Sequence, residues 1–145
     1  MVDTVSDAAS SICPFCERDA LTLIADDGLV FVALDRHPIN RGHLLVAPRR
    51  HARELSELTE AEAATMGRLA RAADLALRNT FGGEVTGTTL WMSNGIDQDV
   101  FHAHLHVIPR TADDGLEIVE DVSRYPLSPL TPPQEDALRS ALHVA

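Results

Sequence analysis

Three histidines near the end of the chain alternate with apolar residues. His102, His104 and His106 are three of the seven histidines, and they fall within a stretch, 100–108, whose pattern predicts a β-strand. Alternate residues of a strand share a face, so this spacing places three imidazoles on one side of it. A buried strand face normally carries Val or Ile, and an exposed one carries Thr, Lys or Glu. Because imidazole titrates near neutral pH, the pattern indicates a site that does chemistry.

Two kinds of site use histidines in this way. One is a mononuclear metal site, which needs further ligands and an open position for the substrate. The other is a nucleophilic site, in which one imidazole attacks while its neighbours hold and neutralise the electrophile. The second kind fits an anion such as a phosphate ester. The residues alone leave both kinds open.

The two cysteines of the chain, Cys13 and Cys16, form a Cys-Pro-Phe-Cys motif. The residues before them, 1–11, contain acidic side chains and lack the basic and apolar regions of a secretion signal, so we expect a cytoplasmic protein. Two thiols at this spacing then favour a metal knuckle or a redox pair over a structural disulfide.

Length and charge limit the classes of protein to which the chain can belong. With 145 residues, 45% of them hydrophobic, it is predicted as a single domain over 1–145, with 1–11 as a loose lead-in and 111–145 as a C-terminal extension. Its formal charge of −10 argues against a nucleic-acid polymer or an anionic membrane as the main partner. A small anionic ligand is compatible with this charge where His, Arg and backbone N–H groups form a local pocket.

The elements that must position these residues are short strands and one long helix. Apolar runs bounded by turn residues predict strands at 21–24, 29–34, 43–47, 88–92 and 100–108. The turn Asp26-Asp27-Gly28 predicts a hairpin between the first two strands, and the short loop around Asn94 predicts a second hairpin that borders the histidine face. Trp91, in the fourth strand, is expected in the core.

The longest helix is predicted over 59–81. Thr59 and Glu62 have the spacing of a capping box, apolar residues recur at helical spacing, and two glycines follow the last turn. Beyond the histidine strand, 116–122 is predicted as an edge strand, and a threonine followed by two prolines predicts a short final helix over 131–141.

The histidine stretch resembles the signature of a known family. His102-Ala-His104-Leu-His106-Val-Ile followed by Pro-Arg is similar to the pattern His-φ-His-φ-His-φ-φ, where φ is apolar, of the histidine triad (HIT) nucleotide hydrolases and transferases. The resemblance covers about residues 13 to 110 and extends to Asn94, Gln98, Val100 and the segments 33–35 and 42–51. It implies an α+β fold with a mostly antiparallel five-stranded sheet, one long helix and a homodimer, to which the residues add a short C-terminal helix.

By this resemblance, His104 is the nucleophile that attacks the α-phosphorus of a purine nucleotide conjugate and forms a nucleotidyl-histidine, which water then hydrolyses. The backbone carbonyl of the preceding histidine accepts from Nδ1–H of His104 and leaves its Nε2 free to attack. His106 holds a non-bridging phosphate oxygen, and Gln98 approaches the leaving group. Asp35 is expected to bind the ribose hydroxyls, and Asn94 to position the ribose or the phosphate.

The resemblance also implies a structural zinc ion. In the zinc-bearing members of the family, and in related hexose-1-phosphate uridylyltransferases, a CxxC knuckle, a downstream histidine and the first histidine of the triad bind the metal. Those positions here are Cys13, Cys16, His51 and His102. Two thiolates and two imidazoles close a tetrahedral site, so the ion would fix the N-terminus to the sheet and take no part in the reaction. Two free or redox thiols are the alternative.

The loop before the histidines departs from the family pattern. A longer glycine-rich turn usually embraces the phosphate there, and Asp97 stands where its glycine would be. Asp99 occupies a substrate-binding position that is often Ser or Thr, and a carboxylate cannot donate a hydrogen bond unless it is protonated. Among the other histidines, His43 is expected as a buried support of the site, and His37 and His143 as surface residues.

We therefore expect a HIT-type hydrolase or nucleotidyltransferase. Its substrate is a dinucleoside polyphosphate, a nucleoside phosphoramidate or an acyl-adenylate, and its partner is this small nucleotide, without a nucleic-acid polymer or a membrane. The first alternative is a nucleotide-binding sensor or interaction module with little turnover. The second is a metal hydrolase that uses all three histidines.

Overall fold

The structure, a computed structural model, describes residues 13–142, so the expected lead-in at 1–11 and His143 lie outside the described residues. Contacts along the chain define two compact units, which meet in the sequence between Gly115 and Leu116. The first unit holds the sheet and every residue predicted for the site. A single domain over 1–145 stays a prediction.

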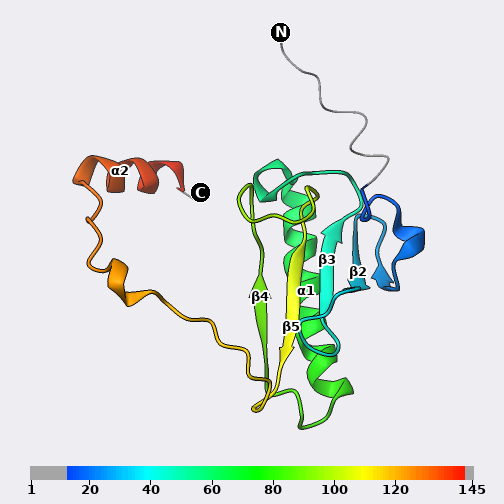
Figure 1. Ribbon diagram of the computed structural model, residues 1–145. Helices are drawn as coiled ribbons and strands as arrows, with labels where there is room; N and C mark the ends of the chain where they lie inside the picture. Colours follow the sequence, from blue (N-terminus) through cyan, green and yellow to red (C-terminus); the bar gives the residue numbers. More distant parts are fainter. Residues whose placement is uncertain (1–12, 143–145) are drawn as a thin grey trace. The chain divides into compact units, whose positions relative to one another are not determined.

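Five strands form one sheet in the first unit, in the order β1-β2-β3-β5-β4, and every neighbouring pair is antiparallel. Their bounds are β1 Leu23–Asp26, β2 Val30–Leu34, β3 Leu44–Pro48, β4 Gly87–Trp91 and β5 Leu105–Arg110. One long helix, α1 (Glu60–Thr80), connects β3 to β4 and packs on the sheet (Figure 1). The predicted α+β fold is confirmed, and so are both predicted hairpins, β1–β2 and β4–β5.

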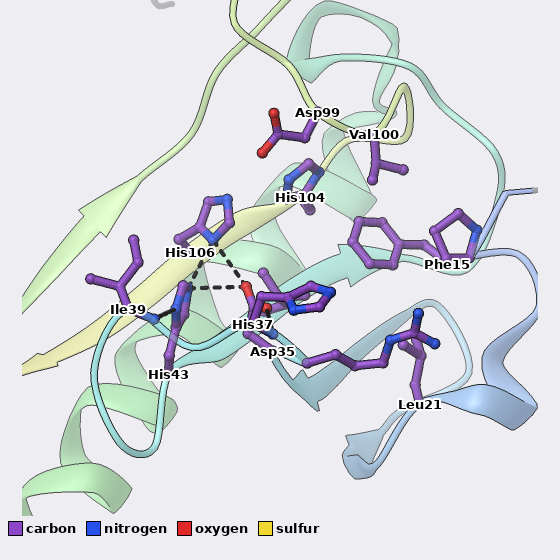
Figure 2. A pocket seen from close by; sticks show the side chains of 13 residues that line it. Phe15, Leu21, Asp35, His37, Ile39, His43, Asp99, Val100, His104 and His106 are labelled. Carbon is purple, nitrogen blue, oxygen red and sulfur yellow. Dashed lines mark hydrogen bonds and ion pairs between the residues drawn. The ribbon is translucent and has the colours of Figure 1, made fainter.

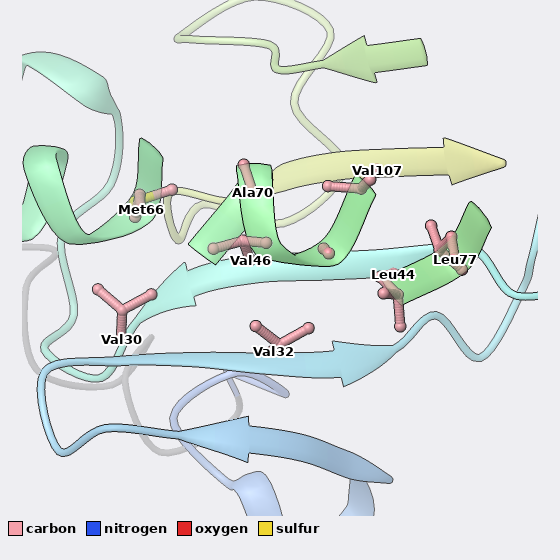
Figure 3. Close-up of a cluster of buried hydrophobic side chains, with 9 residues drawn as sticks. Val30, Val32, Leu44, Val46, Met66, Ala70, Leu77 and Val107 are labelled. Carbon is pink, nitrogen blue, oxygen red and sulfur yellow. The ribbon is translucent and has the colours of Figure 1, made fainter. Parts of the chain in front are cut away.

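The capping box predicted at the start of α1 is present. Thr59 Oγ1 accepts from the backbone N–H of Glu62 at 3.1 Å, and the Glu62 carboxylate accepts from the N–H of Thr59 at 2.9 Å. The buried stripe of the helix packs on the sheet (Figure 3), and its members are Met66, Ala70, Ala73 and Leu77, against Val30, Val32, Leu44, Val46 and Val107. Burying a side chain such as Leu77 contributes about 1.5–3 kcal/mol, so this stripe is a main source of stability.

The opposite face of β2 and β3 is buried as well. There Cys13 and Phe15, from the knuckle at 13–16, pack with a second cluster of strand residues, Phe31, Ala33, Leu45 and Ala47. Burial on both faces explains why these two strands appear in the sequence as continuous apolar runs. The knuckle therefore lies on the side of the sheet opposite α1.

The histidine strand is shorter than predicted. β5 begins at Leu105, whereas the sequence predicts a strand from about residue 100, so only His106 of the three histidines lies in a strand. The ladder between β5 and β3 ends at Leu105. Just before it, the backbone N–H of Ala103 donates to the carbonyl of Ala52 at 2.7 Å, outside the sheet. The histidines before β5 are thus held by loop hydrogen bonds, which a periodicity of two does not reveal.

Trp91 is not in the core. It ends β4 opposite His106, and 49% of its surface is exposed. β4 is the last strand of the sheet, so its residues are covered less than those of β2 and β3. The prediction that Trp91 is a core residue was wrong for this reason.

The second unit contains little regular structure. Residues 116–121 form no strand, so the predicted edge strand at 116–122 is wrong; three acidic residues interrupt its apolar residues. The final helix is confirmed as α2, Pro132–Ala141, with Gln134 capping the N–H of Thr131 at 2.9 Å. Between residues 13 and 142, no helix is long and apolar enough to cross a membrane, and the cytoplasmic location stays a prediction.

Candidate functional site

Two cavities meet at the histidines. The larger, about 360 Å³, is lined by apolar residues, among them Phe15, Leu21 and Leu45, and by polar ones. Figure 2 shows Phe15 beside His104, and Asp35 close to His43 and His106. The smaller, about 130 Å³, is lined by Ile39, Trp91, Ser93, Asp97, Gln98, Asp99, His104 and His106. The side chains shared by both are Ile39, Asp99, His104 and His106, so a ligand that spans the two cavities passes over the two imidazoles.

His104 presents a lone pair to these cavities. Its Nδ1 lies 2.7 Å from the backbone carbonyl of His102, and a carbonyl oxygen can only accept, so Nδ1 carries the proton. Nε2 of the neutral ring is then unprotonated, and it hydrogen-bonds to no other described residue. The side chain is 7% exposed, with the edge of Phe15 packed against it at 5.0 Å between ring centres. The hydrogen bond expected for the nucleophile is therefore present.

His106 presents an N–H instead, and His43 is the reason. The backbone N–H of Ile39 donates to Nδ1 of His43 at 3.0 Å, so the proton of neutral His43 is on Nε2. That N–H donates to Nδ1 of His106 at 2.8 Å, which places the proton of neutral His106 on Nε2. His43 is 1% exposed, as expected of a buried support. The two imidazoles that line both cavities therefore differ: His104 offers an acceptor and His106 a donor.

Burial keeps these supporting imidazoles neutral. It lowers the pKa of His106 to about 4, with further lowering by His104 and His43. Burial also lowers the pKa of His43, against the opposing effect of Asp35, whose Oδ2 lies 3.4 Å from Nε2 of His43. At neutral pH both rings are uncharged, as the hydrogen-bond assignment requires.

Asp35, His43 and His106 bring three possible ligand atoms within 4.8 Å of one another, yet their hydrogen bonds do not suit a metal ion. Nε2 of His43 carries a proton because its Nδ1 accepts from Ile39, and the lone pair of His106 Nδ1 is already used by that proton. His102, the first histidine of the triad, turns to another cluster. This geometry argues against one catalytic ion held by all three histidines.

His102 faces the cysteines. Its Nε2 lies 2.7 Å from the carbonyl of Pro48 and so donates to it, which leaves the lone pair on Nδ1. Nδ1 is 3.5 Å from Sγ of Cys13 and 3.5 Å from Sγ of Cys16, and Nδ1 of His51 is 3.2 Å from Sγ of Cys16. All four ligand atoms lie within 4.8 Å of one another.

This donor set fits zinc. A tetrahedral ion with Zn–S of about 2.3 Å and Zn–N of about 2.0 Å separates its sulfur and nitrogen ligands by about 3.5 Å, close to the distances in the cluster. Both cysteines are free thiols. Burial and the neighbouring Cys13 raise the pKa of Cys16 to about 11, whereas a redox-active thiol needs a lowered pKa. The predicted ligands are thus brought together, and the raised pKa of Cys16 argues against Cys16 as the reactive thiol of a redox pair.

The loop residues occupy different positions. Gln98 is 9% exposed and lines the smaller cavity, but its amide is held by its own loop: Nε2 donates to the carbonyl of Arg53, and Oε1 accepts from Gly95 at 3.1 Å. Asn94 lines neither cavity, because its Oδ1 accepts from the N–H of Leu55 at 2.7 Å. The roles predicted for Gln98 and Asn94 in substrate binding stay predictions.

Asp35, Asp99 and His37 line the larger cavity, and Asp97 lines the smaller one. Asp97 has φ of +57°, in the left-handed region that favours glycine, which agrees with the glycine expected there from the family pattern. His37 is exposed, as predicted, and its backbone N–H donates to Asp35 at 2.8 Å.

Sequence reasoning missed Trp91, Ser93 and Ile39 as cavity residues. A signal for two of them exists, because pairing the fourth strand with the histidine strand as a hairpin puts Trp91 opposite His106 and Ser93 just beyond it. No pattern in the sequence identifies Ile39, which comes from the loop before β3.

Known proteins resemble this chain over most of the site. The family profile described as HIT domain matches residues 18–113. An uncharacterised HIT-like protein of Mycobacterium tuberculosis is 32% identical over 74% of this chain and 78% of its own length. An AP-4-A phosphorylase of the same species is 33% identical over 74% of this chain, and an adenylylsulfatase of Arabidopsis thaliana is 31% identical over 79%.

The chain spans 58% of that phosphorylase and 60% of that adenylylsulfatase. The NitFhit fusion protein of Caenorhabditis elegans is 37% identical over 58% of this chain, and this match covers 19% of that protein. Among solved structures, a zinc-bound histidine triad family protein of Mycobacterium smegmatis is 33% identical, with a TM-score of 0.68 over 77% of this chain and 84% of its own. The profile match across two thirds of the residues, on a fold shared with these structures, shows that the chain belongs to the HIT family.

Proposed function

We propose that this chain is a nucleotide hydrolase or nucleotidyltransferase that cleaves at the α-phosphate of a purine nucleotide conjugate through a covalent nucleotidyl-His104. The observation that carries the proposal is the hydrogen bond from Nδ1 of His104 to the carbonyl of His102. It fixes the tautomer whose Nε2 lone pair faces the cavities, and this is the form of imidazole that can attack phosphorus.

In the first step, Nε2 of His104 forms a bond to the α-phosphorus. The bond from phosphorus to the leaving atom breaks, and its electron pair stays with that atom, which takes up one proton from water. The attacking ring gains positive charge, which the carbonyl of His102 at Nδ1 stabilises. Nε2–H of His106 donates to a non-bridging phosphate oxygen and holds the charge that develops there. Water then breaks the P–N bond, releases the nucleotide and returns one proton to solvent.

The larger cavity suits the nucleoside. Its apolar side chains, such as Phe15 and Leu21, can receive a base, while the carboxylate of Asp35 in the same cavity can accept from two ribose hydroxyls. The carboxylate then meets the sugar and not the phosphate, so it does not oppose binding of an anion.

The relatives support the reaction class. The names of the AP-4-A phosphorylase and the adenylylsulfatase state activities on bonds of an adenylyl group. These bonds have different leaving groups, so the relatives are consistent with a common attack at the α-phosphorus. They do not indicate which leaving group this chain accepts, and that must be inferred from its own residues.

We propose that the Cys13, Cys16, His51 and His102 cluster holds a structural zinc ion. When bound, the ion would supply a fixed link between the knuckle at 13–16 and the loop around His51, with four protein ligands and no open position for substrate. We also propose a homodimer, because β4 is a sheet edge that exposes Leu90 and Trp91, and an exposed edge can pair with a second copy.

A nucleotide-binding module with little turnover is the second candidate. The amide of Gln98 is held by Gly95 and Arg53 within its own loop, so it offers less to a leaving group than an unbound amide would. Multiple turnovers of any nucleotide conjugate would decide against this candidate.

The test is mass spectrometry of the protein quenched during turnover of adenosine 5′-phosphoramidate. We expect an adenylyl adduct on a peptide that contains His104 and none in His104→Ala, whose hydrolysis should fall by about a thousandfold or more. Nucleotide affinity measured by calorimetry should stay within about tenfold, or 1.4 kcal/mol, which separates loss of the nucleophile from loss of the pocket. Undiminished hydrolysis by His104→Ala would refute the covalent mechanism.

A further inference from the structure

The smaller cavity lies next to the attacking atom, and it is distinct from the cavity that suits the nucleoside. Both cavities are bounded by His104, which is 7% exposed and whose Nε2 has no partner among the described residues. If the nucleoside fills the larger cavity, the other substituent of the α-phosphorus extends into the smaller one. This step rests on the proposed function.

The chemistry of the smaller cavity suits a positive charge. Two carboxylates, Asp97 and Asp99, line it, and no Lys or Arg does. The half-exposed indole of Trp91 lines it too, and the face of an indole is the best aromatic partner for an ammonium. The remaining polar groups are Ser93, Gln98 and the two imidazoles, of which His106 is neutral at pH 7. A phosphate chain or a sulfate placed there would meet two negative charges and no fixed positive one.

We propose that the smaller cavity is a leaving-group subsite that selects leaving groups bearing an ammonium, and that Asp97 and Asp99 are its specificity-determining residues. Of the three substrate classes expected from the family, this favours phosphoramidates of amines that carry a second, charged amino group, and aminoacyl-adenylates, in which the α-ammonium survives. It disfavours dinucleoside polyphosphates and adenylyl sulfate.

The reaction on a diamine phosphoramidate balances as follows. Nε2 of His104 bonds to phosphorus, the P–N bond to the amine breaks with its electron pair staying on nitrogen, and that nitrogen takes one proton from water. The diamine leaves with its distal ammonium unchanged, and water hydrolyses the adenylyl-histidine to the nucleotide. The distal ammonium takes no part in bond breaking, so its contacts with Asp97 and Asp99 affect selectivity through binding in the transition state.

The two carboxylates can be neutralised without disturbing the loop. Asp97 has φ of +57°, a conformation that both aspartate and asparagine tolerate better than other side chains. Asp99 is exposed. Asp97→Asn and Asp99→Asn therefore remove charge and keep shape. Asp113→Asn is the matched control, because Asp113 is exposed, lines neither cavity and carries the same charge.

The experiment compares three adenosine 5′-phosphoramidates with the same scissile P–N bond and a four-carbon amine. Their far ends are an ammonium (1,4-diaminobutane), a methyl group (butylamine) and a carboxylate (4-aminobutanoate). For the native protein we expect kcat/KM to be about tenfold or more higher for the ammonium than for the carboxylate, since exposed ion pairs each contribute a few-fold and attraction and repulsion add. The ratio should fall in high salt.

Variants of the two aspartates test whether they cause the preference for the ammonium compound. In the Asp97→Asn, Asp99→Asn double variant the ratio of kcat/KM between the ammonium and carboxylate compounds should approach one, whereas Asp113→Asn should keep the native ratio. Alanyl-adenylate and its N-acetyl form are compared as a second pair. This comparison tests whether the protein also recognises an α-ammonium.

The outcomes separate this inference from the proposed function. No hydrolysis of any compound, the neutral one included, would contradict the proposed function. Hydrolysis of the neutral compound with equal rates for the ammonium and carboxylate forms, or a preference that the double variant retains, would overturn the leaving-group subsite alone.

Discussion

His102 and His104 are separated by the single residue Ala103, yet they belong to two different groups. His102 and His51 face the cysteines, whereas His104 and His106 line the cavities. At His102 the Nε2–H donates to the carbonyl of Pro48, and the Nδ1 lone pair points at two thiols. At His104 the Nδ1–H donates to the carbonyl of His102, and the Nε2 lone pair faces a cavity. The same side chain thus presents opposite nitrogens two residues apart.

The difference shows that the spacing of histidines fixes where they lie, and their hydrogen-bond partners fix what they can do. A backbone carbonyl can only accept, so it selects the tautomer of a neutral ring. The tautomer of His106 is selected indirectly. The N–H of Ile39 donates to Nδ1 of His43, and Nε2–H of His43 then donates to Nδ1 of His106. The predictions below perturb one group at a time.

The largest effect is expected at the cysteine group. Cys13→Ala removes one of four ligands to the proposed zinc and should lower the free energy of unfolding by about 3 kcal/mol or more, which corresponds to a fall in Tm of about 10 °C for a chain of this size. Elemental analysis should give one zinc per native chain and much less in the variant. Asp113→Asn serves as the unaffected control. A Cys13→Ala protein with a full zinc content and the native Tm would contradict the ligand assignment.

A smaller effect is expected from His106, whose titration should make the free energy of unfolding depend on pH. Burial lowers the pKa of His106 to about 4 from 6.5, so between these values the unfolded chain binds a proton that the folded chain does not. Stability due to this site is therefore present above about pH 6.5 and falls as the pH is lowered toward 4. From pH 7 to 5, urea unfolding should show a loss about 2 kcal/mol greater in the native protein than in His106→Gln. Equal losses would mean that His106 titrates normally in the folded protein.

The smallest effect is expected at His43, which acts through His106. His43→Leu fills the buried position but removes the donor, and should lower kcat by about tenfold with little change in KM, because His106 no longer holds its N–H toward the phosphate. His43→Gln offers an amide N–H near the position of Nε2 and should recover most of the rate. If both variants are equally impaired, burial and not the hydrogen bond explains the role of His43.

Much of the fold follows from local patterns. The capping box of Thr59 and Glu62, the helical spacing of Met66 to Leu77 and the turn residues around Gly28 are short-range signals, and each is found in the structure. The family signature also placed the cysteines and His51 beside His102, a long-range prediction that the distances support.

Most of the misses depend on partners distant in the sequence. The end of the β5 ladder is decided by Ala52, fifty-one residues before Ala103, and the exposure of Trp91 is decided by its place on the edge strand. The stretch 116–122 contains four apolar residues of a kind typical of strands, but the structure assigns no strand to residues 116–121. The tautomers could not be predicted from the residues either, because they depend on which carbonyl or N–H lies within hydrogen-bonding distance.

Three consecutive residues, 51–53, connect the two groups mechanically. His51 faces the cysteines, the carbonyl of Ala52 holds the backbone of Ala103 at 2.7 Å, and the carbonyl of Arg53 holds the amide of Gln98 in the loop that borders the smaller cavity. This short segment therefore links the cluster of cysteines to the loop that borders the smaller cavity. A displacement of His51 would shift the carbonyl of Arg53 and with it the amide of Gln98, so we expect changes at the cluster to alter the position of this loop.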